Sequence, residues 1–215
     1  MSELVELASG AQARITNGPC ERVVVCVNGG QGRAVPGTWS SSLEWLVHHL
    51  APRFPRLAFI EVRYRVKSWR ELERCVEDAR AAIDAAAARQ TLLLGFSMGG
   101  AVAIAAAGER SVRGVLGLAP WIPDRLDLGT LRGRRLDVLH GSLDRWLPGI
   151  PGVSSVSSRR GYERARALGV EGSYTLVRGA VHGVALRSPL GVLVPLPRAA
   201  TWTRLVAAQL ETFAT

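Results

Sequence analysis

The sequence contains one lysine, Lys67, among its 27 basic residues. The other positive charges are arginines scattered along the chain, although the formal net charge is +9. The densest basic cluster, 132–135, leads into a predicted strand and is interpreted as a solvated loop. Zinc-finger spacing, an aromatic RNA-binding signature and a basic helix are all missing. We therefore expect no nucleic-acid partner, whereas attraction of anionic substrates or surfaces stays open.

Cysteine and long hydrophobic runs are also scarce. Cys20, Cys26 and Cys75 do not form a disulfide framework, and the last two fall in apolar strand and helix patterns typical of a core. No apolar run approaches the roughly 20 residues that cross a bilayer, and the first residues lack the regions of a signal peptide. These absences predict a cytoplasmic protein without membrane association. No clustered histidine or cysteine ligands indicate a metal or an organic cofactor, so we expect neither.

Apolar, β-rich runs alternate with helical patterns along the chain. Strands are expected at 22–28, 57–62, 91–94, 112–119, 136–140 and 174–177, and helices at 39–50, 69–89, 98–107, 162–168 and 199–213. The first twenty residues could add an antiparallel edge strand. Near-continuous apolar strands between helices predict an α/β protein with a mostly parallel central sheet and helices on both faces. No repeat or linker divides the chain, so we expect a single domain over 1–215.

The stretch GFSMGG, residues 95–100, places a serine where a buried strand meets a buried helix. A tight turn at that point strains the backbone and requires the small residues that flank Ser97. The turn projects the hydroxyl into the cleft at the carboxyl end of the sheet. The N–H of Met98, at the start of the helix, points toward any oxyanion formed there. Ser97 is therefore predicted to be a nucleophile.

A serine nucleophile requires a histidine base and an orienting carboxylate. His182 follows the strand at 174–177, and Asp144 follows the strand at 136–140, so both are expected at the same sheet edge as the serine. Asp124 and Asp137 are the alternative acids. His140 is expected to pack or bond locally beneath the loop without a catalytic role.

Taken together, these motifs resemble the α/β-hydrolase superfamily. GFSMGG is similar to its nucleophile elbow, HGSLD (140–144) to its acid loop and GAVHG (179–183) to its histidine loop. The resemblance covers residues 22–215 and implies the α/β-hydrolase fold. The connection at 120–135, where this family inserts lid domains, is short, so the resemblance implies a form without a lid. Small esterases, thioesterases and dienelactone-hydrolase-like members have this character.

The resemblance also implies a second oxyanion donor from the loop at 27–32. Gly30 is the first candidate for this backbone N–H and Gln31 the second, with Met98 as the other donor of the oxyanion hole. Asn28 stands where the family often has histidine, which matters little when a backbone N–H is required. A phosphate-binding loop is the rival interpretation, but the P-loop lysine and the G-x-G-x-x-G spacing are missing.

Several residues near strand ends are candidates for the substrate pocket. They are Gln31, Trp121, Ile122, Trp146 and Leu147, and ordinary loop packing is the alternative for each. Arg63 and Arg65 are candidates for binding a substrate carboxylate or phosphate, or else for solvated ion pairs. The apolar segment 184–196 is compatible with a cover over the cleft or with a homodimer contact.

The resulting hypothesis is a serine hydrolase that cleaves a carboxylic ester of a small or medium acyl substrate through a Ser-His-Asp triad and an acyl-enzyme. Serine at position 97 argues against epoxide hydrolase and haloalkane dehalogenase chemistry, which the family performs with aspartate. A thioesterase or a lactonase would use the same machinery. A catalytically silent family member that binds a ligand or partner is the alternative from another class.

Overall fold

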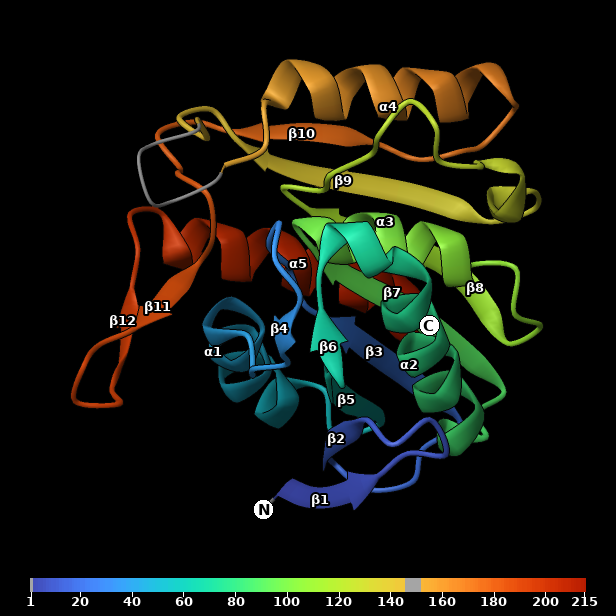
Figure 1. Ribbon diagram of the computed structural model, residues 1–215, viewed down its shortest axis with the longest axis vertical. Helices are drawn as coiled ribbons and strands as arrows, with labels where there is room; N and C mark the ends of the chain where they lie inside the picture. The colour runs from blue at the N-terminus through green and yellow to red at the C-terminus, as the bar shows by residue number, and fades with distance from the viewer. Residues whose placement is uncertain (1, 146–151) are drawn as a thin grey trace.

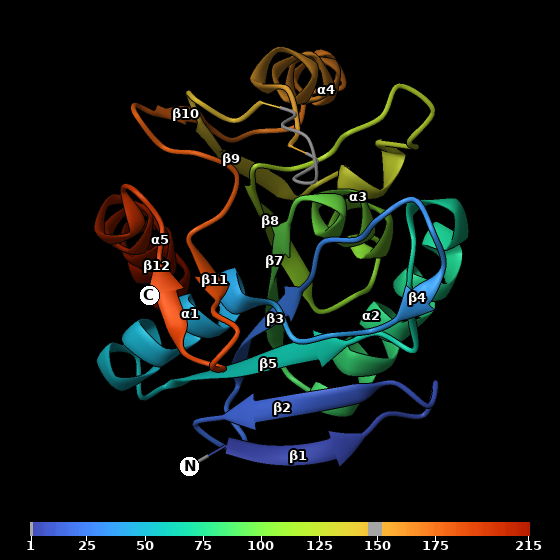
Figure 2. The same cartoon turned by 60° about the vertical axis from the view of Figure 1, so that its left-hand side comes forward.

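The computed structural model describes residues 2–145 and 152–215 of the chain. Its centre is an eight-stranded sheet with the order β1-β2-β5-β3-β7-β8-β9-β10 (Figures 1 and 2). The strands of this sheet are β1 (Ser2–Glu6), β2 (Gln12–Thr16), β5 (Leu57–Arg63), β3 (Arg22–Val27), β7 (Gln90–Phe96), β8 (Val112–Leu118), β9 (Arg135–Gly141) and β10 (Tyr174–Val177). The six strands from β5 to β10 in this order run parallel, and β1 and β2 pair antiparallel at one edge.

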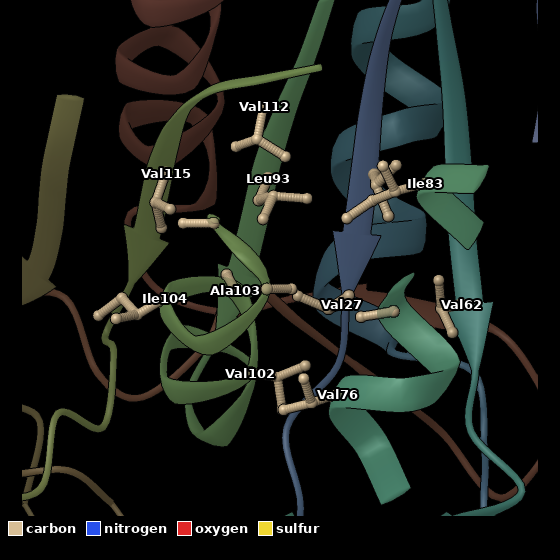
Figure 3. Packing of buried hydrophobic residues seen from close by; sticks show 14 of the residues in the cluster. Val27, Val62, Val76, Ile83, Leu93, Val102, Ala103, Ile104, Val112 and Val115 are labelled. Carbon is tan, nitrogen blue, oxygen red and sulfur yellow. The ribbon is translucent and has the colours of Figure 1, made fainter. Parts of the chain in front are cut away.

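Helices cover both faces of the sheet. They are α1 (Ser41–Leu50), α2 (Leu72–Ala86), α3 (Met98–Ala106), α4 (Ser155–Ala167) and α5 (Ala199–Ala214), with 3₁₀ turns η1 (Ala51–Arg53), η2 (Trp69–Glu71) and η3 (Gly129–Leu131). One hydrophobic cluster packs α2, α3 and α4 against one face, and a second packs α1 and α5 against the other. Figure 3 shows Val76 of α2 beside Val102 of α3 in the first cluster. The predicted α/β architecture is thus confirmed.

Two short antiparallel pairs lie outside the central sheet. β4 (Val35–Pro36) pairs with β6 (Val66–Lys67), and β11 (Ala185–Arg187) pairs with β12 (Leu193–Pro195). The second pair is the form taken by the apolar 184–196 segment, and it lies beside α1 in both views of the fold (Figures 1 and 2). None of the helices within 2–145 and 152–215 combines the length and the apolar character that a bilayer crossing requires.

Several element boundaries differ from those expected. The helix predicted at 162–168 is α4 and begins at residue 155, where the Ser154 hydroxyl accepts a hydrogen bond from the Ser157 N–H. The first turns of α4 are rich in arginine and lack the apolar spacing from which a helix is predicted, so this start was missed. The helix predicted at 69–89 divides into η2 and α2, which ends where Ala87 turns left-handed with φ 45°. The N-terminal segment forms two strands rather than one.

Candidate active site

Ser97 occupies a strained turn between β7 and α3. Its φ is 57° and its ψ is −120°, a conformation that L-residues rarely adopt and that typically costs about 1–3 kcal/mol. The end of β8 holds this turn, because the Ser97 N–H donates to the Leu118 carbonyl at 3.0 Å and the Ser97 carbonyl accepts from the Trp121 N–H at 2.9 Å. The Gly100 N–H donates to the same carbonyl, also at 2.9 Å. The backbone of the elbow is therefore fixed by the sheet itself.

The glycines around Ser97 allow close contacts that no side chain would permit. A Cβ at Gly95 would lie 2.3 Å from the Gly99 carbonyl oxygen, and a Cβ at Gly99 would lie 2.2 Å from the Val27 carbonyl oxygen. A Cβ at Gly100 would lie 2.4 Å from Pro120 Cβ. The helix α3 thus packs directly on the ends of β3 and β7, which explains why small residues surround the serine.

Asp144 and His182 are brought together by the loops after β9 and β10. His182 Nδ1 lies 2.7 Å from Asp144 Oδ2, and the other carboxylate oxygen accepts from the Val153 N–H at 3.1 Å. The Asp144 side chain is fully buried, whereas the His182 side chain is 11% exposed. The two loops approach so closely at Gly141 that a Cβ at this position would lie 2.5 Å from the Ala180 carbonyl oxygen. The acid is enclosed, and the imidazole reaches the surface of the cleft.

A second histidine also contacts the carboxylate. His140 is fully buried, and its Nε2 lies 3.1 Å from Asp144 Oδ2 and 3.0 Å from the Val153 carbonyl oxygen. Burial raises the pKa of Asp144, but hydrogen bonds from His140 and then from His182 outweigh it, so the pKa lies below its ordinary value. Asp144 is therefore ionised at neutral pH and fixes the proton of His182 on Nδ1, which leaves Nε2 free to act as a base.

Phe96 links the turn that carries Ser97 to the imidazole of His182. The Phe96 ring lies 5.0 Å from the His182 ring, centroid to centroid, and Phe96 directly precedes Ser97 in the chain. In the described part of the chain, His182 Nδ1 donates to Asp144, and no hydrogen bond joins His182 to Ser97 Oγ. Nucleophile–base hydrogen bonds often tighten only when substrate binds. The described contacts therefore join Asp144 to His182 and leave the contact between His182 and Ser97 to be made.

The loop after β3 lies directly over the start of α3. A Cβ at Gly30 would lie 2.2 Å from Met98 Sδ, so the glycine backbone passes against the Met98 side chain. Across the described residues, the N–H groups of Gly30 and Met98 have no hydrogen-bond partner. Gly30 therefore packs against the Met98 side chain, and both candidate oxyanion donors have unpaired N–H groups among the described residues. The Gln31 carbonyl instead accepts from the Trp69 N–H, which holds the loop from outside.

Asn28 shapes this loop through its side chain. Its Nδ2 donates to the Thr38 carbonyl at 2.9 Å, and its Oδ1 accepts from the Gly29 N–H at 2.6 Å. The Asn28 carbonyl accepts from the Tyr64 hydroxyl at 3.1 Å. The asparagine that replaces the family's usual histidine thus organises the loop, a role that the sequence did not reveal.

A cavity of about 590 Å³ opens beside His182. Its apolar wall is formed by Trp39, Phe96, Leu143, Val181, Ala185, Leu186 and Leu196. A larger cavity, of about 660 Å³, lies against α2 and the 123–130 connection and includes none of the triad residues. The cavity beside His182 is the candidate substrate site, because of these two it alone is lined by one of the candidate catalytic residues.

The structure does not place the candidate pocket residues together. Trp146 and Leu147 lie outside the described residues. Trp121 contacts Ser97 through its backbone, while its half-buried side chain packs against the α2–α3 core, and neither it nor Gln31 lines the cavity beside His182. Ile122 is buried in the same core. Three of the wall residues, Ala185, Leu186 and Leu196, come from the apolar 184–196 segment, for which a cover over the cleft was one of the two expectations.

The alternative acids lie elsewhere. Asp124 is exposed and pairs with Arg164 at 3.1 Å. Asp137 pairs with Arg135 at 2.6 Å and accepts from the Ser173 hydroxyl. Among the candidate carboxylates it is Asp144 that contacts His182.

The two arginine candidates for substrate binding have structural partners. Arg63 Nε donates to the Gly37 carbonyl at 3.0 Å. Arg65 Nε lies 2.7 Å from Asp78 Oδ1, and the Asp78 side chain is fully buried. Both arginines therefore have partners within the fold, which favours a structural role for them.

A strained serine elbow on the same sheet edge as a hydrogen-bonded Asp–His pair defines the α/β-hydrolase class. The model of the alpha/beta hydrolase family matches residues 24–213, so this chain belongs to that family. A comparison with curated proteins finds no match.

Solved structures share the fold over nearly the whole chain. A sugar hydrolase from Lactococcus lactis is similar with a TM-score of 0.71 and 16% identity, covering 99% of this chain and 98% of its own. Est1E from Butyrivibrio proteoclasticus has a TM-score of 0.68 and 13% identity, covering 100% and 99%. A monoacylglycerol lipase from Paleococcus ferrophilus has a TM-score of 0.65 and 14% identity, covering 97% and 98%. At these identities the likeness concerns the fold.

Proposed function

We propose that this protein is a serine hydrolase that cleaves a carboxylic ester of a small or medium acyl substrate. The observation that carries the proposal is the 2.7 Å contact between His182 Nδ1 and Asp144 Oδ2 at the sheet edge where the strained Ser97 turn lies. A binding protein has no physical need for a nucleophile elbow, an ionised buried acid and an oriented imidazole at one edge.

The reaction follows from the roles of these groups. Ser97 Oγ attacks the ester carbonyl carbon while His182 Nε2 takes the hydroxyl proton. The N–H groups of Gly30 and Met98 stabilise the tetrahedral oxyanion. His182 returns the proton to the departing alkoxide, which leaves an acyl-enzyme. Water then loses a proton to His182 and attacks the acyl carbon, and the carboxylic acid departs as Ser97 regains its proton.

The cavity supports a substrate of modest size. Its volume of about 590 Å³ lies in the range of small-molecule sites, and its wall is mainly apolar. One of the structurally similar proteins reported above is named as a monoacylglycerol lipase, which favours ester cleavage here as well. Thioesters and lactones present the same carbonyl to the same groups, so they are included in the test.

The proposal is tested with a fluorophosphonate probe and with panels of p-nitrophenyl esters and acyl thioesters of increasing chain length. We expect peptide mass spectrometry to locate the probe on Ser97, with turnover of short and medium oxygen esters. Faster turnover of thioesters would assign a thioesterase. A folded protein that neither reacts with the probe nor turns over any panel member would be a silent binding protein, and the proposal would be wrong.

A further inference from the structure

The cavity beside His182 carries positive charge on one side. Its lining includes Lys67, Arg145 and Arg187, and among the described residues that line it none is acidic. Arg187 is paired with Glu44, which lies outside the cavity lining. The other two cations have no carboxylate partner within the described ranges, unlike Arg14, Arg65 and Arg135 elsewhere in the chain.

Lys67 is the better placed of the two free cations. It ends β6, is partly buried, and donates from Nζ to the Thr38 hydroxyl at 2.7 Å. The Thr38 carbonyl accepts a hydrogen bond from the Asn28 side chain, so the ammonium lies beside the 27–32 loop that carries the proposed oxyanion donor Gly30. Burial without a compensating carboxylate lowers the pKa of Lys67. A partly desolvated ammonium with unused N–H donors can bind an anion through charge-assisted hydrogen bonds.

We propose that the substrate carries an anionic oxygen group, a carboxylate or a phosphate, that binds Lys67 while an apolar portion contacts the wall formed by Leu143, Leu186 and Leu196. The proposal rests on the proposed hydrolase function and specifies its substrate class: an amphiphilic, negatively charged acyl ester. Arg145, exposed at the same cavity, adds to the attraction. The net charge of +9 favours encounter with such a substrate.

Matched esters separate anion recognition from ester cleavage. One pair is 3-(butanoyloxy)benzoate and its methyl ester, which places the anion on the leaving group. The other is phenyl hydrogen adipate and methyl phenyl adipate, which places it on the acyl group. We expect the protein to cleave the anionic member of at least one pair about tenfold faster in kcat/KM, the size of one charge-assisted hydrogen bond. Turnover of the neutral esters without such a preference in either pair would overturn the inference and leave the hydrolase standing.

Variants identify the residue. Lys67→Met is expected to lower kcat/KM about tenfold more for the anionic ester than for its neutral partner, which removes the preference, and Lys67→Arg is expected to retain most of the preference. Arg56→Met, an exposed arginine away from the cavity, is the control for lost net charge. If Lys67→Met slows the neutral and anionic esters equally, Lys67 only supports the loop through Thr38 and the inference is wrong.

A binding measurement is independent of catalysis. Because the chain has one lysine, lysine-selective ¹⁵N labelling gives one side-chain NMR signal. We expect hexanoate to shift the Lys67 Nζ signal saturably and hexanamide to leave it unchanged. This result would support the anion site even if no ester were cleaved, which would be a failure of the proposed function alone. The same signal unchanged by hexanoate would overturn the inference.

Discussion

His140 Nε2 lies 3.1 Å from Asp144 Oδ2, the same oxygen that contacts His182 Nδ1 at 2.7 Å. His140 Nε2 also lies 3.0 Å from the Val153 carbonyl oxygen. Because both neighbours of this nitrogen are acceptors, it carries a proton and donates. Asp144, the proposed orienting acid, is thus held by a fully buried imidazole as well as by His182.

His140 is expected to act on the reaction through Asp144 and not by contact with the substrate, so its replacement should slow the reaction. His140→Leu removes the donor to Asp144, raises the pKa of that carboxyl and loosens the orientation of His182. A hydrogen bond to a charged group contributes about 1.5–3 kcal/mol, so kcat/KM should fall about 10- to 100-fold. The measurement is the kcat/KM profile against pH. His140→Asn is the conservative comparison, and a His140→Leu enzyme with wild-type kcat/KM at every pH would contradict the positioning role.

The stability that Asp144 contributes is expected to depend on pH. Its folded pKa lies below the unfolded value near 3.9, so its ionised form is stabilised by folding. The contribution is complete above the unfolded pKa and is lost as pH falls through the folded pKa. The free energy of unfolding of Asp144→Asn should therefore be lower than that of the wild type at pH 7, with the gap closing below about pH 4. A gap that stays constant down to pH 3 would contradict this assignment.

The strained backbone at Ser97 is expected to lower the stability of the folded protein while it positions the hydroxyl for reaction. Ser97→Ala should abolish ester turnover and probe labelling while the protein stays folded. Ser97→Gly should also be inactive, but more stable than Ser97→Ala by about 1 kcal/mol, because glycine adopts the positive φ without strain. Denaturant unfolding compares the two variants. Retained turnover in Ser97→Ala would remove the serine from the mechanism.

Gly99→Ala is expected to damage the elbow. The added Cβ would lie 2.2 Å from the Val27 carbonyl oxygen, a backbone atom that cannot move aside, so α3 must shift. We expect a loss of stability of about 1–3 kcal/mol or more, the usual range for overpacking, together with lost activity. Gly108→Ala is the matched control, since the nearest atom to its Cβ would be 4.0 Å away. Equal melting temperatures for the two variants would show that the elbow tolerates the shift.

Lys67→Met is expected to leave the fold as stable as the wild type or more so. Burial lowers the pKa of Lys67, which means that folding disfavours the ammonium at neutral pH. The wild-type protein should gain stability relative to Lys67→Met as pH rises through the lowered folded pKa toward the ordinary lysine value. Thermal unfolding between pH 7 and pH 10 measures this. Marked destabilisation of the variant at pH 7 would assign Lys67 a structural role.

The amino-acid sequence by itself determined the architecture and the elbow. Alternating apolar strands and helices specify a parallel sheet covered on both faces, since each element has to bury its apolar side. The run from Gly95 to Gly100 specifies the strained turn, because close backbone contacts admit only small residues. Both are local sequence patterns, so they can be recognised without knowledge of the tertiary contacts.

Only the tertiary structure decided which groups meet. Asp137 lies within β9, whereas Asp124 and Asp144 both follow strands, and the contact of Asp144 with His182 depends on how the loops after β9 and β10 fold over each other. The contact of His140 with Asp144 depends on the same loops. Lys67 reaches the cavity through the pairing of β6 with β4, and Leu186 through the hairpin beside α1. These contacts join segments far apart in the chain. The spacing of residues along the chain does not specify the loop geometry that brings them together.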